Sequence, residues 1–181
     1  MIITLQEIFR LLVMTLAVGY IFSDLRKYDP LQKGISWEGI SIGILAATPG
    51  VILHELAHKF VAIAYGLKAE FFASYIGLGI GIVLKLISSP FLVFVPGYVS
   101  ITGASPLTSA VIALAGPLTN GLLWLISFLL LKSKKTYSTK TTMILILNKK
   151  INGILFIFNL IPIPPFDGGQ AAFSLINYFS A

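Results

Sequence analysis

The sequence contains no cysteine, which excludes disulfides and thiolate metal ligands. It also has little charge: only 11% of its 181 residues are charged, against about a quarter in soluble domains. No charged residue occurs from Leu86 to Leu131. A basic face with interleaved aromatics is missing as well, so the net charge of +6 does not indicate nucleic-acid binding. These absences exclude an ordinary soluble domain and predict a protein that spans the cell membrane several times, with the lipid bilayer as a partner.

The hydrophobic residues, 56% of the chain, gather in long segments. The four that we expect to be helical are about Leu5–Leu25, Trp37–Tyr65, Pro106–Leu131 and Thr142–Ile161. Lys149 and Lys150 interrupt the fourth, so a start after them is the alternative. We therefore predict an all-α polytopic membrane protein with about four transmembrane helices, forming one domain over residues 1–181.

Residues 66–103 are apolar, but their sequence pattern does not favour a helix. Gly77, Gly79 and Gly81 alternate with apolar residues, and a period of two is typical of a strand. Because an open strand edge cannot face lipid, we expect a small membrane-associated β element, either a hairpin or a re-entrant sheet. A strand face bare of side chains would let another backbone approach, so these three glycines are predicted to bind substrate. The alternative is one more membrane helix over Phe71–Leu92.

The sequence His54-Glu55-Leu56-Ala57-His58 lies within the second apolar segment and holds both histidines of the chain. On a helix, His54 and His58 project from the same face and can share one Zn²⁺. Glu55, beside the first histidine, is then suited to act as the catalytic base. A chance pattern is the alternative, but ionisable groups at membrane depth are costly and usually functional.

A catalytic zinc usually has three protein ligands, and here the third must be one of seven carboxylates. Most of these lie in loops or near segment ends, and Glu55 points elsewhere on its helix. Glu70 has Lys68 as a neighbour and is typical of an interfacial charge. Asp167 is the only charged residue from Ile151 to the end of the chain. We select Asp167, with a turn aspartate before Gly168 as the alternative.

Three motifs occur in order at apolar segments: HELAH, AGPLTN and NLIPIPPFDGG. Together they resemble the site-2 proteases, a family of intramembrane zinc metalloproteases, over about Trp37–Gln170. The resemblance implies one zinc per chain held by His54, His58 and Asp167, with Glu55 as the base. It also implies that Asn120 and Asn159 lie near the active site, where we predict that they bind substrate. For both asparagines the alternative is a helix–helix hydrogen bond.

The expected function is hydrolysis of a peptide bond in or near a transmembrane segment of a protein or peptide substrate. The chain departs from the family in its glycine-rich YIGLGIGIV stretch and in the lack of a PDZ-like or CBS-like domain, which predicts a minimal form. A non-proteolytic zinc-binding scaffold or carrier is the alternative, although a carrier should show internal repeats. The resemblance implies a zinc site nearer the cytosol, whereas the positive-inside rule favours the opposite orientation, and we follow the motifs because they are more specific than a charge count.

Overall fold

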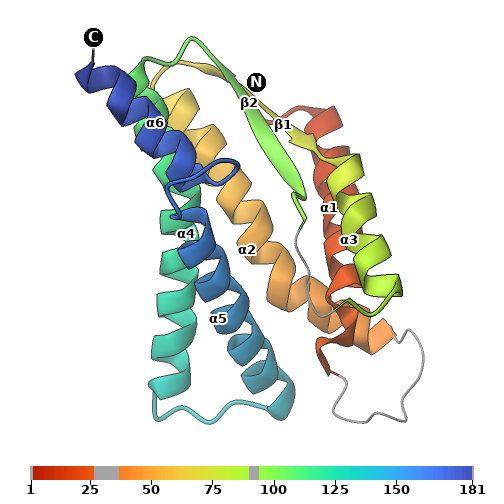
Figure 1. Ribbon diagram of the computed structural model, residues 1–181. Coiled ribbons are helices and arrows are strands. Elements are labelled where there is room, and N and C mark those ends of the chain that lie inside the picture. Colours follow the sequence, from red (N-terminus) through yellow and green to blue (C-terminus); the bar gives the residue numbers. More distant parts are fainter. Residues whose placement is uncertain (1, 27–36, 90–93, 181) are drawn as a thin grey trace.

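The structure is a computed structural model that describes residues 2–26, 37–89 and 94–180 (Figure 1). Its elements are α1 (Leu5–Ile21), a 3₁₀ turn (Ser23–Arg26), α2 (Trp37–Ala64), β1 (Lys68–Ala73), α3 (Tyr75–Leu86), β2 (Gly97–Thr102), α4 (Pro106–Lys132), α5 (Thr139–Asn159) and α6 (Asp167–Phe179). The helices dominate, and the predicted class, an all-α membrane protein with a small β element, is confirmed.

Three helices within the described ranges are long and apolar enough to cross a membrane: α2, α4 and α5. The expected fourth, α1, has 17 residues and includes Glu7 and Arg10. The predicted alternative start of α5 after Lys150 is wrong, because the helix begins at Thr139 and runs through both lysines. The ammonium group of Lys149 lies 5.9 Å from the centre of the Phe128 ring on α4, which lessens the cost of its charge.

The core forms where α2 meets α1, β1 and α5. Met14 and Val18 of α1 pack there with Ala46 and Ala47 of α2, and all four are fully buried. Small residues on α2 let the neighbouring helices approach closely, as is usual in membrane bundles. Figure 1 shows α2 between the α4–α5 pair and the α1–α3 pair. The helix that carries both histidines is therefore held from several sides.

The β element is a two-stranded antiparallel sheet in which Lys68 pairs with Thr102 and Ala73 with Gly97. Just beyond the strands, the amide of Ser74 donates to the carbonyl of Pro96 (3.0 Å). Hydrogen-bonded and non-bonded pairs alternate in such a sheet, so Val99 and Ile101 of β2 turn their backbone groups away from β1.

The outer edge of β1 is covered by α1. The outward N–H of Phe71 donates to Oε1 of Glu7 (2.8 Å), and its carbonyl accepts from Nη1 of Arg10 (2.8 Å). The outward groups of Val99 and Ile101 have no such partner among the described residues. The sheet therefore has one closed edge, on β1, and one open edge, on β2.

The prediction that Gly77, Gly79 and Gly81 lie on a strand is wrong, because they belong to α3. Ser74 caps this helix by accepting a hydrogen bond from the amide of Gly77 (3.1 Å). Gly77 and Gly81 are one helical turn apart on α3. A Cβ on Gly77 would lie 1.9 Å from the Val95 carbonyl oxygen, and one on Gly81 would lie 2.7 Å from Cδ1 of Ile21. Close packing of α3 accounts for Gly77 and Gly81, whereas a Cβ on Gly79 would meet nothing within 4 Å. The expected β element is present, and a helix does lie between its strands, but α3 is shorter than the membrane helix that was the alternative over Phe71–Leu92, of which residues 90–92 lie outside the described ranges.

Candidate metal centre

His54 and His58 come from the second half of α2 and lie one turn apart, as their spacing predicts. Both are 8% exposed. Their rings meet edge to face with centroids 4.7 Å apart, and their Nε2 atoms are separated by 3.1 Å. Two nitrogens with available lone pairs thus converge on one point at the surface of α2.

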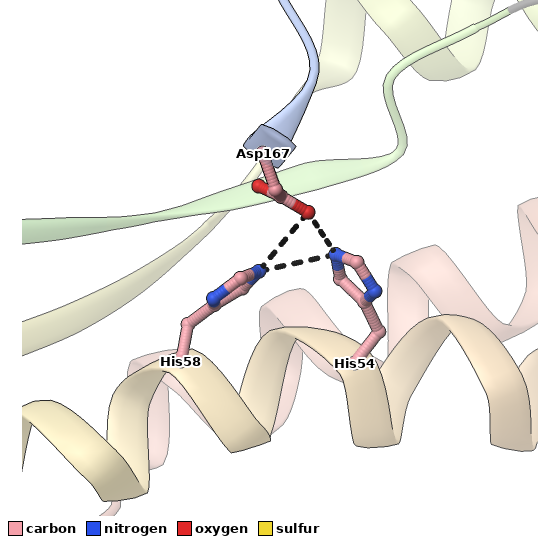
Figure 2. Close-up of side chains that lie close together, drawn as sticks. All are labelled: His54, His58 and Asp167. Carbon is pink, nitrogen blue, oxygen red and sulfur yellow. Dashed lines mark hydrogen bonds and ion pairs between the residues drawn. The ribbon is translucent and has the colours of Figure 1, made fainter. Parts of the chain in front are cut away.

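Asp167 is the first residue of α6 and faces the two histidines (Figure 2). Its Oδ2 lies 3.0 Å from Nε2 of His54 and 3.5 Å from Nε2 of His58. The glycines that follow allow this placement: a Cβ on Gly168 would lie 2.4 Å from the Leu160 carbonyl oxygen, and one on Gly169 would lie 2.3 Å from the Ile163 carbonyl carbon. The loop before α6 can therefore fold back tightly against the first turn of that helix.

These three residues fit a metal ion. Four-coordinate zinc with ligands at about 2.0–2.1 Å places ligand atoms roughly 3.3 Å apart, close to the three separations observed. Oδ2 of Asp167 is buried and accepts no hydrogen bond, which a metal would remedy. Gly116 of α4 leaves the necessary room, since a Cβ there would lie 2.3 Å from Nε2 of His58. No other group of three or more such side chains gathers in the part of the chain that the structure describes.

The charge state of Asp167 also suits a ligand. Burial by itself raises the pKa of this carboxyl, but the two facing histidines outweigh that effect and lower the pKa to about 2. The side chain is therefore a carboxylate at neutral pH. Of its surface, 20% remains exposed, so the centre is not sealed.

Helix α4 contacts both rings at Nδ1, the nitrogen that does not face Asp167. Nδ1 of His58 lies 2.7 Å from the carbonyl oxygen of Ile112, and Nδ1 of His54 lies 2.6 Å from Oδ1 of Asn120. Outer partners of this kind fix the ring orientation of metal-binding histidines. The segment around AGPLTN thus provides room through Gly116 and support through Asn120.

Glu55 lies beside the centre without joining the triangle. It is 8% exposed, and His54, His58 and Asp167 are close enough to act electrostatically on its carboxylate. Within residues 2–26, 37–89 and 94–180 its carboxylate makes no hydrogen bond, so the oxygens are available as proton acceptors.

The other predicted site residues lie in different environments. Asn120 contacts His54, but it also donates to the carbonyl of Gly50 (3.0 Å) and to Oδ1 of Asn152 (2.8 Å), so it joins α4 to α2 and α5 as well. Asn159 is the last residue of α5 and is half-buried. Gly77, Gly79 and Gly81 lie on α3, which packs beside α1.

The sequence reasoning missed two polar groups. One is the asparagine pair Asn148 and Asn152 on α5, whose spacing of four in an apolar helix was an available signal. The other is a fully buried ion pair between Lys59 of α2 and Glu7 of α1. Lys59 directly follows His58, but its partner on α1 lies 52 residues away in the chain.

The fold and the centre define the class of a helical membrane protein with a candidate metal site. A family model described as peptidase family M50 matches residues 42–145, which is more than half of the chain, and the chain belongs to that family. The resemblance to the site-2 proteases is thereby confirmed. The matched range contains HELAH and AGPLTN and ends before Asp167.

Two similar proteins carry the provisional name of a zinc metalloprotease. One, from Methanocaldococcus jannaschii, is 38% identical over 165 residues, which cover 90% of this chain and 81% of that protein. The other, from Synechocystis, is 27% identical over 164 residues, which cover 91% of this chain and 38% of that protein. No solved structure matches the chain.

Proposed function

We propose that the chain is an intramembrane zinc metalloprotease that cleaves peptide bonds in or near transmembrane segments of its substrates. The observation that carries the proposal is the triangle of His54, His58 and Asp167, in which both histidines lie on a helix long and apolar enough to cross a membrane. Family membership and the names of the two relatives support zinc as the metal. The proposed enzyme is one domain over residues 1–181 and a multi-pass protein of the cell membrane.

In this proposal His54, His58 and Asp167 hold one zinc ion per chain. The chemistry that zinc supplies when bound is Lewis acidity, which lets water act as a nucleophile at neutral pH. Glu55 accepts the proton that the attacking water loses and delivers it to the nitrogen of the leaving amine. Its burial and its lack of a hydrogen-bond partner among the described residues favour this role.

The substrate must leave its helical form before cleavage, because a helix uses its carbonyls in internal hydrogen bonds. We infer that the unwound segment adds to the open edge of β2, where Val99 and Ile101 offer unpaired backbone groups. In Figure 2 the β2 ribbon crosses the view at the level of Asp167. This edge replaces the glycines of α3 as the docking surface.

The experiment that tests the function separates metal binding from catalysis. Purified protein should hold about one zinc per chain, and His54→Ala or Asp167→Ala should lose most of it. Glu55→Gln should keep the zinc, while cleavage of a membrane-embedded peptide falls by about 10²-fold or more because the proton acceptor is gone. Glu70→Ala is the matched control, since this carboxylate pairs with Arg10 (2.6 Å) rather than with a histidine. Undiminished cleavage by Glu55→Gln would remove Glu55 from the mechanism.

A further inference from the structure

The two histidines are supported by α4 in chemically different ways. His58 faces the backbone carbonyl of Ile112, which can only accept, so the ring proton must lie on Nδ1. His54 faces the side-chain amide of Asn120, which has one accepting end and one donating end. The position of the proton on His54 therefore depends on which end of that amide faces the ring.

Two acceptors hold the Asn120 amide in its observed orientation. Its Nδ2 donates one hydrogen to the Gly50 carbonyl (3.0 Å) and the other to Oδ1 of Asn152 (2.8 Å). If the amide turned over, its oxygen would face both acceptors, and its NH₂ group would face Nδ1 of His54. The proton of His54 would then move to Nε2, the nitrogen that faces Asp167.

Asn152 is itself held so that its oxygen points at Asn120. The side chain is fully buried, and its Nδ2 donates to the backbone carbonyl of Asn148 (2.9 Å), which fixes the amide. Room for it comes from Gly50 on α2, where a Cβ would lie only 2.4 Å from Oδ1 of Asn152. The orienting contacts thus run from the backbone of α5 to His54 without a break.

We propose that Asn152 is a positioning residue: it keeps the Asn120 amide oriented and thereby keeps Nε2 of His54 unprotonated and ready to bind the metal. The part of this inference that concerns the metal rests on the proposed function. The part that concerns the ring proton does not, so the two can fail separately.

The first measurement follows the ring protons in the metal-free protein. Labelling histidine with ¹⁵N gives signals from two residues only, since the chain has two histidines, and the spectra are recorded under conditions in which both rings are neutral. In the wild type both should carry the proton on Nδ1. Asn152→Leu removes the acceptor, and Gly50→Ala displaces it without changing Asn152. Each should shift His54 to a mixture of proton positions and leave His58 unchanged.

The second measurement is zinc affinity by competition with a chelator. Asn152→Leu and Gly50→Ala should each weaken zinc binding about tenfold, the low end of the effect of changing an outer partner. Asn152→Asp keeps an oxygen toward Asn120 but loses the donor to Asn148, so it should bind zinc more tightly than Asn152→Leu and less tightly than the wild type. Ser127→Ala is the control for lost packing. It removes the hydrogen bond that the Ser127 hydroxyl donates to Oδ1 of Asn148, and this bond involves neither Asn152 nor Asn120.

Three results would overturn the inference. His54 could keep its proton on Nδ1 in both Asn152→Leu and Gly50→Ala. The signals of His58 could shift equally, or Ser127→Ala could have the same effect, and either would indicate general loosening. A wild type that binds no zinc would instead contradict the proposed function, while the proton measurement still decides the role of Asn152.

Discussion

Single glycines decide where side chains of the centre can lie. Gly116 faces both histidines, and the methyl group of alanine would occupy the space next to Nε2 of His58. Gly79 of α3 is also a glycine within a helix, but a Cβ added to it would have no neighbour within 4 Å. The two positions therefore form a matched pair for substitution.

Gly116→Ala should weaken zinc binding by about 10- to 100-fold, because the added methyl displaces the ring of His58. Gly79→Ala should leave zinc binding unchanged and raise stability by about 0.5–1 kcal/mol, since alanine favours a helix. Zinc titration and unfolding in detergent micelles measure both effects. Wild-type zinc affinity in Gly116→Ala would show that the room beside the rings is not needed.

At the residue scale, the sequence predicted which three side chains meet. With no cysteine and only two histidines, few groups were left as metal ligands, and Asp167 was isolated enough to select. The structure brings it to His54 and His58. Asn152 could not be predicted in this way, because its importance lies in a contact with Asn120 that depends on how α4 and α5 pack.

Between elements, the buried pair of Glu7 and Lys59 joins α1 to α2 one residue after the metal motif. Oε1 of Glu7 also accepts from Phe71 of β1, so one carboxylate connects three elements. By contrast, the pair of Arg10 and Glu70 lies at the surface, where the Glu70 side chain is 47% exposed.

Glu7→Ala should destabilise the protein by about 3–5 kcal/mol, because it leaves the Lys59 ammonium group buried without a partner. Glu70→Ala should cost about 1 kcal/mol or less, as for other exposed pairs. Replacing Glu7 and Lys59 together by methionine should restore part of the loss. The free energy of unfolding in micelles is the quantity to compare, and equal losses in Glu7→Ala and Glu70→Ala would contradict the argument.

The open edge of β2 gives a prediction for substrate binding. Val99→Pro or Ile101→Pro removes an outward N–H without breaking the pairing with β1, so zinc and stability should be kept. Cleavage should fall by about three- to tenfold for the lost hydrogen bond. Ser100→Pro removes a donor that pairs with β1 and should lower stability as well. Normal cleavage in both Val99→Pro and Ile101→Pro would exclude this edge as the docking surface.

The element that the sequence predicted least well lies between the two strands. The alternating glycines predict a strand, whereas Gly77 and Gly81 mark a helix face that packs closely. A spacing of four satisfies both periods, so the pattern could not distinguish them. The long helices were predicted well because length and hydrophobicity define them without reference to neighbours.

For the whole molecule, a metal at this centre would tie the helix α6 to α2, two elements far apart in the chain. Removing zinc with a chelator should therefore lower the melting temperature. With free zinc at about 1,000 times its Kd, the stabilisation should reach about 4 kcal/mol. Asp167→Ala should melt at the same temperature with and without zinc. A wild type whose melting does not respond to zinc would contradict this prediction.

The closed edge of β1 also limits how copies of this protein can associate. A sheet with two open edges is divalent, and divalent units can add to one another without end, as in fibrils. Because Glu7 and Arg10 occupy the backbone of Phe71, this sheet is monovalent. Pairing between two copies through β2 would stop at the dimer, and it would occupy the same edge as a substrate strand. Self-association through the sheet and substrate binding would therefore exclude each other.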